Sequence, residues 1–115
     1  MMFRQWSLLD GEKRTEAAEA SIVRELGVTV EPLDDEIAAT LGIPPRTTGL
    51  VITSLADAQP GDQAGLRPGD VIEQIGDLAV TDPPAAAAAL TASRHRRVAL
   101  IVNRHGEDLR IELVQ

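Results

Sequence analysis

The chain has 115 residues, a formal net charge of −7 and no cysteine. This length suits one domain, and the lack of thiols excludes disulfides and thiolate metal sites. The acidic charge is concentrated in residues 31–82, which hold ten acidic and two basic side chains. Because such a balance repels phosphate backbones, we expect no nucleic-acid partner.

The sequence contains no segment typical of a membrane span or a secretory signal. No stretch reaches the about 18 apolar residues that a spanning helix needs. The first residues include charges such as Arg4 and Glu12, where a signal peptide would have an apolar core. If the parent protein is exported, we expect this chain to be a piece of it.

The N-terminal part is predicted to be a leader or linker. Residues 12–25 have a helical composition with a thin apolar face, so a linker helix and a disordered leader are both compatible with it. We place the domain boundary near Arg24. The prediction is therefore a leader over residues 1–24 and a domain over residues 25–115.

The first elements of the predicted domain are a strand and a short helix. Residues 28–31 alternate as a half-exposed strand does, and Pro32 ends the run. Asp34 or Asp35 can cap a helix that stops at Gly42. Together these signals predict a strand and a helix joined by a tight connection.

Further strands follow at regular intervals. Strand-like runs lie over residues 49–55, 71–75 and 98–102. Residues 56–65 are predicted to be a loop that includes a short helical turn. After the turn at His105-Gly106, apolar and polar residues alternate as in the second strand of a hairpin.

The clearest helix follows Asp82. An acidic cap, Pro83 at the first position and a run of alanines predict a helix from Pro83 onward. Helical spacing places Ala86, Ala89 and Leu90 on one face. This face either lines a groove or packs in the core. The whole element order predicts an α+β domain with a mostly antiparallel sheet.

The run Ala64–Ile72 reads Ala-Gly-Leu-Arg-Pro-Gly-Asp-Val-Ile. Pro68 fixes φ near the value of a turn, and Gly69 can adopt the positive φ that a type II turn requires. Because a buried strand follows, we interpret the turn as structural and not as a binding site.

This run resembles a characteristic segment of PDZ domains, especially those of bacterial HtrA-type serine proteases. The resemblance covers residues 25–115, including Glu25-Leu26-Gly27-Val28 and the later Gly49-Leu50-Val51-Ile52. It implies a PDZ fold, a partly open antiparallel β-barrel or sandwich flanked by two helices in the permuted bacterial strand order.

A glycine before a strand either simply starts that strand or turns amides outward into an anion-binding nest. The resemblance implies the nest, where Gly27 would help to hold a peptide's terminal carboxylate. The strand after it would pair with the peptide by β-augmentation. The helix after Asp82 would form the opposite wall. The residues expected to bind peptide are Glu25, Leu26, Gly27, Val28, Thr29, Val30, Ala86, Ala89 and Leu90.

The resemblance implies a module that captures C-terminal or unfolded peptides. Such a module would regulate or feed an HtrA-type serine protease domain outside this chain, in a periplasmic or extracytoplasmic setting, with oligomerisation through the parent protein. Two alternatives stay open. The chain is a PDZ module of another membrane or secretion system, such as a site-2 or tail-specific protease or a secretion component, or it is a structural assembly module whose groove is filled by its own leader, residues 1–24, or by a neighbouring domain.

We expect no catalytic or metal site and no cofactor in this chain. The two histidines, His95 and His105, lie in a charged loop and in a turn, and no serine has a nucleophile-elbow motif. The acidic run at residues 34–36 is explained by helix capping. The basic run at residues 94–97 follows a helix end, where cations favour the dipole.

Overall fold

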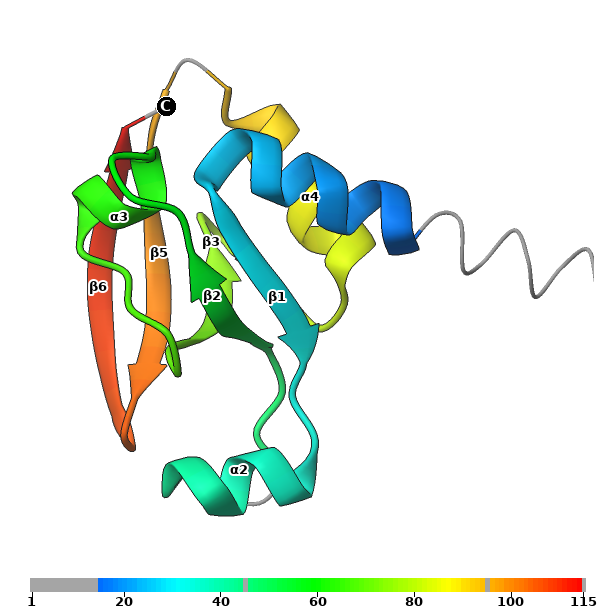
Figure 1. Cartoon of the computed structure of the whole chain (residues 1–115), viewed down its shortest axis with the longest axis vertical. Coiled ribbons are helices and arrows are strands. Elements are labelled where there is room, and N and C mark those ends of the chain that lie inside the picture. The colour runs from blue at the N-terminus through cyan, green and yellow to red at the C-terminus, as the bar shows by residue number, and fades with distance from the viewer. Residues whose placement is uncertain (1–14, 45, 95, 115) are drawn as a thin grey trace, which may run out of the picture.

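The computed structural model describes residues 15–44, 46–94 and 96–114, which form one antiparallel sheet with helices around it (Figure 1). The sheet order is β1-β2-β3-β5-β6, and β4 pairs with β3 beside this path. The strands are β1 (Val28–Pro32), β2 (Leu50–Leu55), β3 (Val71–Ile75), β4 (Leu78–Ala79), β5 (Arg97–Arg104) and β6 (Glu107–Val114). The helices are residues 15–26 (helix 15–26), α2 (Asp35–Leu41), α3 (Pro60–Ala64) and α4 (Pro83–Ala92).

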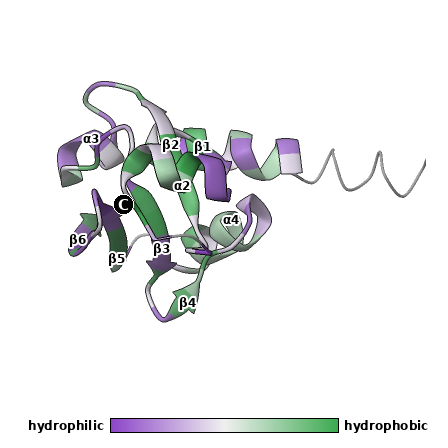
Figure 2. Cartoon of the chain, turned by 90° about the horizontal axis from the view of Figure 1, so that it is seen from below, coloured by the Kyte–Doolittle hydropathy of each residue, from purple (hydrophilic) through white to green (hydrophobic). Residues whose placement is uncertain are grey.

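The predicted α+β class with an antiparallel sheet is confirmed. All pairings in the described sheet are antiparallel. The large core is aliphatic and joins residues from the sheet, from α4 and from helix 15–26. Figure 2 shows hydrophilic residues along α3, at the periphery of the molecule. A smaller apolar cluster of Ala38, Ile43, Val51 and Val71 anchors α2.

The predicted boundaries of α2 are also confirmed. The Asp34 carboxylate accepts a hydrogen bond from the Ile37 N–H at 2.7 Å, which caps the helix. Gly42 ends it with a φ of 71°, in the left-handed region that glycine adopts without strain. The two signals read from the sequence therefore act at the two ends of the helix.

Strand β4 was not predicted. It has two residues, Leu78 and Ala79, and both are exposed. The strand pairs with the end of β3 after the turn at Gly76-Asp77. Because a pair of exposed residues shows no burial pattern, hydrophobic periodicity carries no signal for such a strand.

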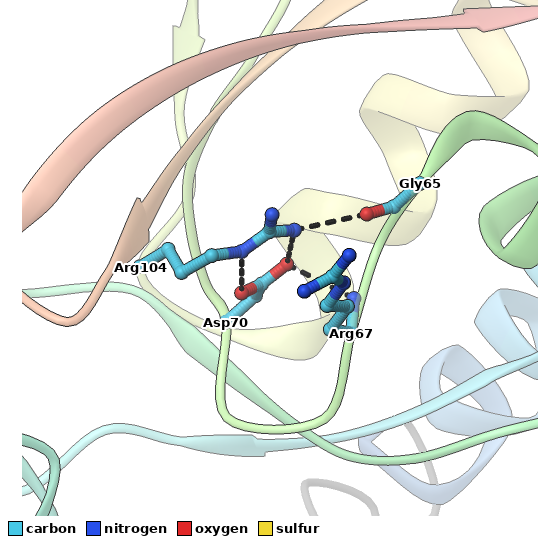
Figure 3. A network of polar contacts seen from close by, with 4 residues as sticks. All are labelled: Gly65, Arg67, Asp70 and Arg104. Carbon is cyan, nitrogen blue, oxygen red and sulfur yellow. Dashed lines mark hydrogen bonds and ion pairs between the residues drawn. The ribbon is translucent and has the colours of Figure 1, made fainter.

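The turn before β3 has the predicted geometry. Gly69 has a φ of 92°, and the Asp70 N–H donates to the Arg67 carbonyl at 3.1 Å. The Asp70 carboxylate is buried and accepts from the Arg67 N–H at 3.0 Å. Figure 3 shows that it also accepts two hydrogen bonds, each of 2.8 Å, from the Arg104 guanidinium of β5. A further bond of 2.9 Å joins Arg104 to the Gly65 carbonyl.

The hydrogen bonds to Asp70 raise the pKa of Arg104 above its ordinary value, against the opposing effect of burial. The side chain of Asp70 is 2% exposed, so its charge depends on Arg104 for compensation. The turn is thus fixed from one side by β5. This contact supports the structural interpretation of the Gly65–Asp70 segment.

Packing extends across the predicted boundary at residue 25. Ala18 and Ile22 of helix 15–26 are 7% and 1% exposed, and Ile22 belongs to the large core. Residues 12–14 of the expected helix lie outside the described residues. The leader of residues 1–24 stays a prediction, but its described helix packs on the domain.

Candidate functional site

Strand β1 lies at one end of the sheet and, among the described strands, pairs with β2 alone. Val30 of β1 lies opposite Ile52 of β2. Ile52 donates its N–H to Asp70 and accepts from the Gly69 N–H, both at 2.8 Å, on the far side of β2. Since hydrogen-bonded and non-bonded pairs alternate in an antiparallel ladder, the main-chain groups of Val30 face the open side of β1.

The same alternation places Val28 on the open side. The Gly27 carbonyl accepts a hydrogen bond from the Ala56 N–H at 2.8 Å. Gly27 and Ala56, which directly follows β2, are therefore a hydrogen-bonded pair of the ladder. Val28, the next residue along, therefore points its N–H and C=O outward. Pro32 has no N–H, so the row of donors on this edge consists of Val28 and Val30.

The intervening residue Thr29 faces β2 with its main chain. Its carbonyl accepts from the Thr53 hydroxyl at 3.3 Å, and its side chain is exposed. Val28 and Val30 are buried as whole residues, at 0% and 1% exposure. The main-chain groups on the open edge of β1 are thus not paired by a further described strand, and in this state they are covered together with the apolar side chains.

Helix α4 packs against β1 and β3. The Asp82 carboxylate caps it by accepting from the Ala85 N–H at 2.9 Å. Ala86, Ala89 and Leu90 share one face, as predicted, and each is at most 2% exposed. Whether these three residues contact a peptide stays a prediction, because in this state the face is already covered.

The contacts of α4 with β1 and β3 lie on its covered side, and helix 15–26 runs beside α4 in both views (Figures 1 and 2). Its buried residues Ala18, Ile22 and Leu26 recur every fourth position. Ile22 and Leu26 share the large core with Ala89 and Leu90. Composition alone predicted only a thin apolar face. The apolar stripe at spacing four is the sequence signal from which the packing of this helix could have been predicted.

The junction between helix 15–26 and β1 is at Gly27. Its φ is 74°, and its N–H donates to the Val23 carbonyl at 2.8 Å. The expectation of an outward-facing N–H at Gly27 is therefore wrong for this state, because the donor closes the last turn of the helix. A Cβ at Gly27 would lie 2.4 Å from the Gln59 Cβ, which explains why glycine is needed here.

An ion pair links the same junction to the end of α4. Glu25 accepts a hydrogen bond from the Arg94 guanidinium, which belongs to the basic run predicted to follow α4. The side chains are 18% and 49% exposed. The negative charge of Glu25, next to the expected carboxylate site, thus has a cationic partner that sequence reasoning did not assign.

A separate pocket of about 250 Å³ is lined by residues that include Glu73 of β3 and Asp108 of β6. One oxygen of Glu73 is buried without a hydrogen-bond donor among the described residues. Burial, and then the neighbouring Asp108 carboxylate, raise the pKa of Glu73 to about 7. A proton on Glu73 would supply the missing donor between the two carboxylates.

The described residues show little that resembles a catalytic centre. No three His, Cys, Asp or Glu side chains gather there as a metal site would require. His105 is exposed in the β5–β6 turn with a φ of 54°, whereas His95 lies outside the described residues. Within the same part of the chain, no helix has the length and hydrophobicity to cross a membrane.

Comparison with known proteins identifies the fold. The sequence pattern of the PDZ domain family matches residues 51–104. The solved structure of the HtrA-type protease AlgW with decapeptide superposes on 77% of this chain and 27% of its own, with a TM-score of 0.68 and 29% identity. This chain contains a PDZ domain. It resembles the PDZ domains of HtrA-type and DegP-type serine proteases.

Two further comparisons define the extent of the likeness. The HtrA3 PDZ domain bound to a phage-derived ligand (FGRWV) shares the fold over 76% of this chain and 79% of its own, with a TM-score of 0.63 and 17% identity. The probable periplasmic serine endoprotease DegP-like of Rickettsia conorii (strain Malish 7) is 36% identical over 55 residues, which is 48% of this chain and 11% of that protein.

The corresponding protein of Rhizobium meliloti (strain 1021) is 35% identical over 69 residues, 60% of this chain and 14% of its own length. This PDZ domain therefore matches a small part of much longer serine endoproteases. In the AlgW comparison, too, the likeness covers about a quarter of the protease chain.

Proposed function

We propose that this PDZ domain captures a C-terminal or unfolded peptide by strand addition to β1. In the parent protein, the captured segment regulates or feeds an HtrA-type serine protease domain that lies outside this chain. The chain alone is then a non-catalytic part of an endopeptidase, without a cofactor or metal. Its partners are the peptide, the protease domain and further copies assembled through the parent protein.

The open edge of β1 carries this proposal. Val28 and Val30 present their main-chain N–H and C=O groups where no described strand pairs with them. An extended peptide laid antiparallel along this edge would satisfy those groups and gain affinity from the ladder. Helix α4 is positioned to bound the same edge on its other side.

The comparisons support the same function. AlgW was solved with a decapeptide and the HtrA3 PDZ domain with the ligand FGRWV, so related domains are peptide-bound. The curated relatives are described as periplasmic, which supports an extracytoplasmic setting. The net charge of −7 favours peptide over nucleic acid as the ligand.

The first test uses the whole chain and two matched peptides. A fluorescein-labelled decapeptide ending in valine is titrated, once with a free C-terminus and once as the amide, with fluorescence anisotropy as the readout. If a carboxylate is recognised near Gly27, the free acid binds about tenfold more tightly. Equal affinities would restrict the function to internal or unfolded segments, and no binding by either peptide would reject it.

The second test examines strand addition itself. Each amide of the bound peptide is N-methylated in turn, which removes one donor without changing the side chains. Affinity should fall at alternate positions only, because main-chain groups of β1 face the peptide at every second residue. A uniform loss, or none, would contradict pairing with Val28 and Val30. Casein incubated with the pure chain should remain uncleaved.

A further inference from the structure

We propose that helix 15–26 gates the peptide groove of this domain, and this inference rests on the function proposed above. In the described state, the last turn of the helix adjoins Gly27 and accepts its N–H through the Val23 carbonyl. A peptide that brings a carboxylate to Gly27 and an apolar side chain to α4 must first displace that turn. Binding and helix docking therefore exclude each other at this end of the groove.

The first observation is the burial of the groove residues. The candidate wall residues Ala86, Ala89 and Leu90 are at most 2% exposed, and the same holds for Val28 and Val30 of β1. A ligand side chain gains affinity only from apolar surface that it can reach. The described state offers almost none on these five residues, so something must move before an apolar ligand side chain can bind.

The helix is the element whose contacts can be exchanged. Ile22 and Leu26 lie in the same apolar cluster as Ala89 and Leu90, and helix 15–26 runs beside α4 (Figure 1). The opposite face of the helix is open to solvent, with Val23 44% exposed. An element held on one side only can detach at lower cost than an interior strand.

The second observation is the hydrogen bond at the junction. The Gly27 N–H donates to the Val23 carbonyl at 2.8 Å, so it is not available to a ligand. Unwinding one turn would free this amide and withdraw Ile22 from the cluster in a single movement. The donor for a carboxylate and the space for an apolar side chain are thus released together.

The Glu25–Arg94 ion pair fastens the same turn to the end of α4. A peptide carboxylate arriving at Gly27 would compete with Glu25 for the guanidinium of Arg94. Carboxylate binding would in this way weaken the contact that holds the helix closed. Because only open molecules bind, the apparent dissociation constant equals the intrinsic one divided by the open fraction.

The matched variants are Ile22→Ala and Ile75→Ala. Both residues are isoleucines with at most 2% exposure, one on the gate and one in β3. Each loses core contacts, but only the first weakens the closed state relative to the open one. We expect Ile22→Ala to bind the free-acid decapeptide about tenfold more tightly than the parent chain, and Ile75→Ala to bind it within about twofold.

The outcomes separate the two proposals. Unchanged or weaker binding by Ile22→Ala would overturn the gate and leave peptide capture intact. Failure of the parent and of Ile22→Ala to bind would reject peptide capture and the gate with it. Tighter binding by Ile22→Ala alone supports the gate.

A second measurement keeps the proposal testable if Ile22→Ala folds poorly. The chain has no cysteine, so Glu16→Cys and Thr91→Cys place spin labels on exposed positions of helix 15–26 and α4 without competing thiols. We expect the distance distribution between the labels to widen when the free-acid peptide is added, and to widen with the amide only at about tenfold higher peptide concentration. An unaltered distribution at saturating free-acid peptide would overturn the gate.

Discussion

Two glycine-containing segments each lead directly into a strand of the sheet, and different interactions stabilise their conformations. The Gly65–Asp70 turn leads into β3. It is stabilised by the buried carboxylate of Asp70, which accepts two hydrogen bonds from the Arg104 guanidinium of β5. The Gly27 junction leads into β1 and is held by the apolar stripe of helix 15–26, one main-chain bond and a partly exposed ion pair.

The contrast explains why the two junctions serve different roles. Opening the first would leave Asp70 as a buried, unpaired charge, which is among the most costly states in a protein interior. Opening the second exposes apolar side chains that a ligand can cover again. The segment that reveals the family is therefore scaffold, and the segment proposed for binding is the one with replaceable contacts.

The largest expected effect comes from breaking the fixed junction. Arg104→Met removes the guanidinium but keeps much of the aliphatic stem. Asp70, with its side chain 2% exposed, then keeps only the hydrogen bonds available within its own turn. We expect the free energy of unfolding to fall by about 3 kcal/mol, measured by urea denaturation.

The control is Arg104→Met combined with Asp70→Asn, which removes the unpaired charge. This double variant should recover part of the loss, because an amide is cheaper to bury than a carboxylate. A loss below about 1 kcal/mol in the single variant would show that water reaches Asp70, and would contradict the description of this turn as locked.

The second expected effect concerns the other junction. Gly27→Ala must place a Cβ at positive φ and 2.4 Å from the Gln59 Cβ. Gly42→Ala has nearly the same φ, 71°, but meets nothing within 4 Å. The control should therefore lose about 1 kcal/mol from backbone strain alone, and Gly27→Ala about 1 kcal/mol more from the overlap. Equal losses would mean that Gln59 moves aside freely.

The third expected effect is a pH dependence of the free energy of unfolding, caused by Glu73 of β3. Burial raises the pKa of Glu73 to about 7, so the folded chain binds this proton more tightly than the unfolded chain does. The stabilisation is fully present below the ordinary pKa of 4.5 and is lost as the pH rises through about 7. Solvent screening limits the effect to roughly 1 kcal/mol.

Urea denaturation between pH 5 and 8 measures this slope, with Glu73→Gln as the matched control. The substitution should reduce the decrease in the free energy of unfolding with rising pH, because glutamine has no proton to lose. A parent chain whose stability rises over this range, or whose slope survives in Glu73→Gln, would contradict the assignment.

Much of this fold could be predicted because local signals and tertiary contacts agree. The Asp34 and Asp82 caps and the helix end at Gly42 depend on residues within a few positions, so the local sequence predicts them directly. The positive φ of Gly69 follows from the Pro-Gly pair. The face of Ala86, Ala89 and Leu90 follows from helical spacing alone.

The candidate site was harder to predict because it depends on contacts between distant segments. The Glu25–Arg94 pair joins residues far apart in the sequence, and the residue types alone do not predict which charges will pair. The N–H of Gly27 is committed to Val23 only because helix 15–26 continues to Leu26. A thin apolar stripe gives no indication of what it will cover until α4 is placed beside it.

The smallest expected effect tests the ion pair at the Gly27 junction. Arg94→Ala removes an exposed partner of Glu25, and such pairs contribute about 0.5 kcal/mol. Arg97→Ala is the matched control, because Arg97 pairs with Glu112 at 3.7 Å on the exposed β5–β6 hairpin, away from helix 15–26. Both variants should lose similar small amounts of global stability.

Hydrogen exchange distinguishes the two variants. Arg94→Ala should speed exchange of the Leu26 and Gly27 amides about twofold, which corresponds to the free energy of the lost pair. Arg97→Ala should leave these amides unchanged, because its pair does not touch the last turn of the helix. Equal protection of Gly27 in both variants would mean that the apolar stripe alone holds the helix on α4, and that the ion pair has no part in closing the groove.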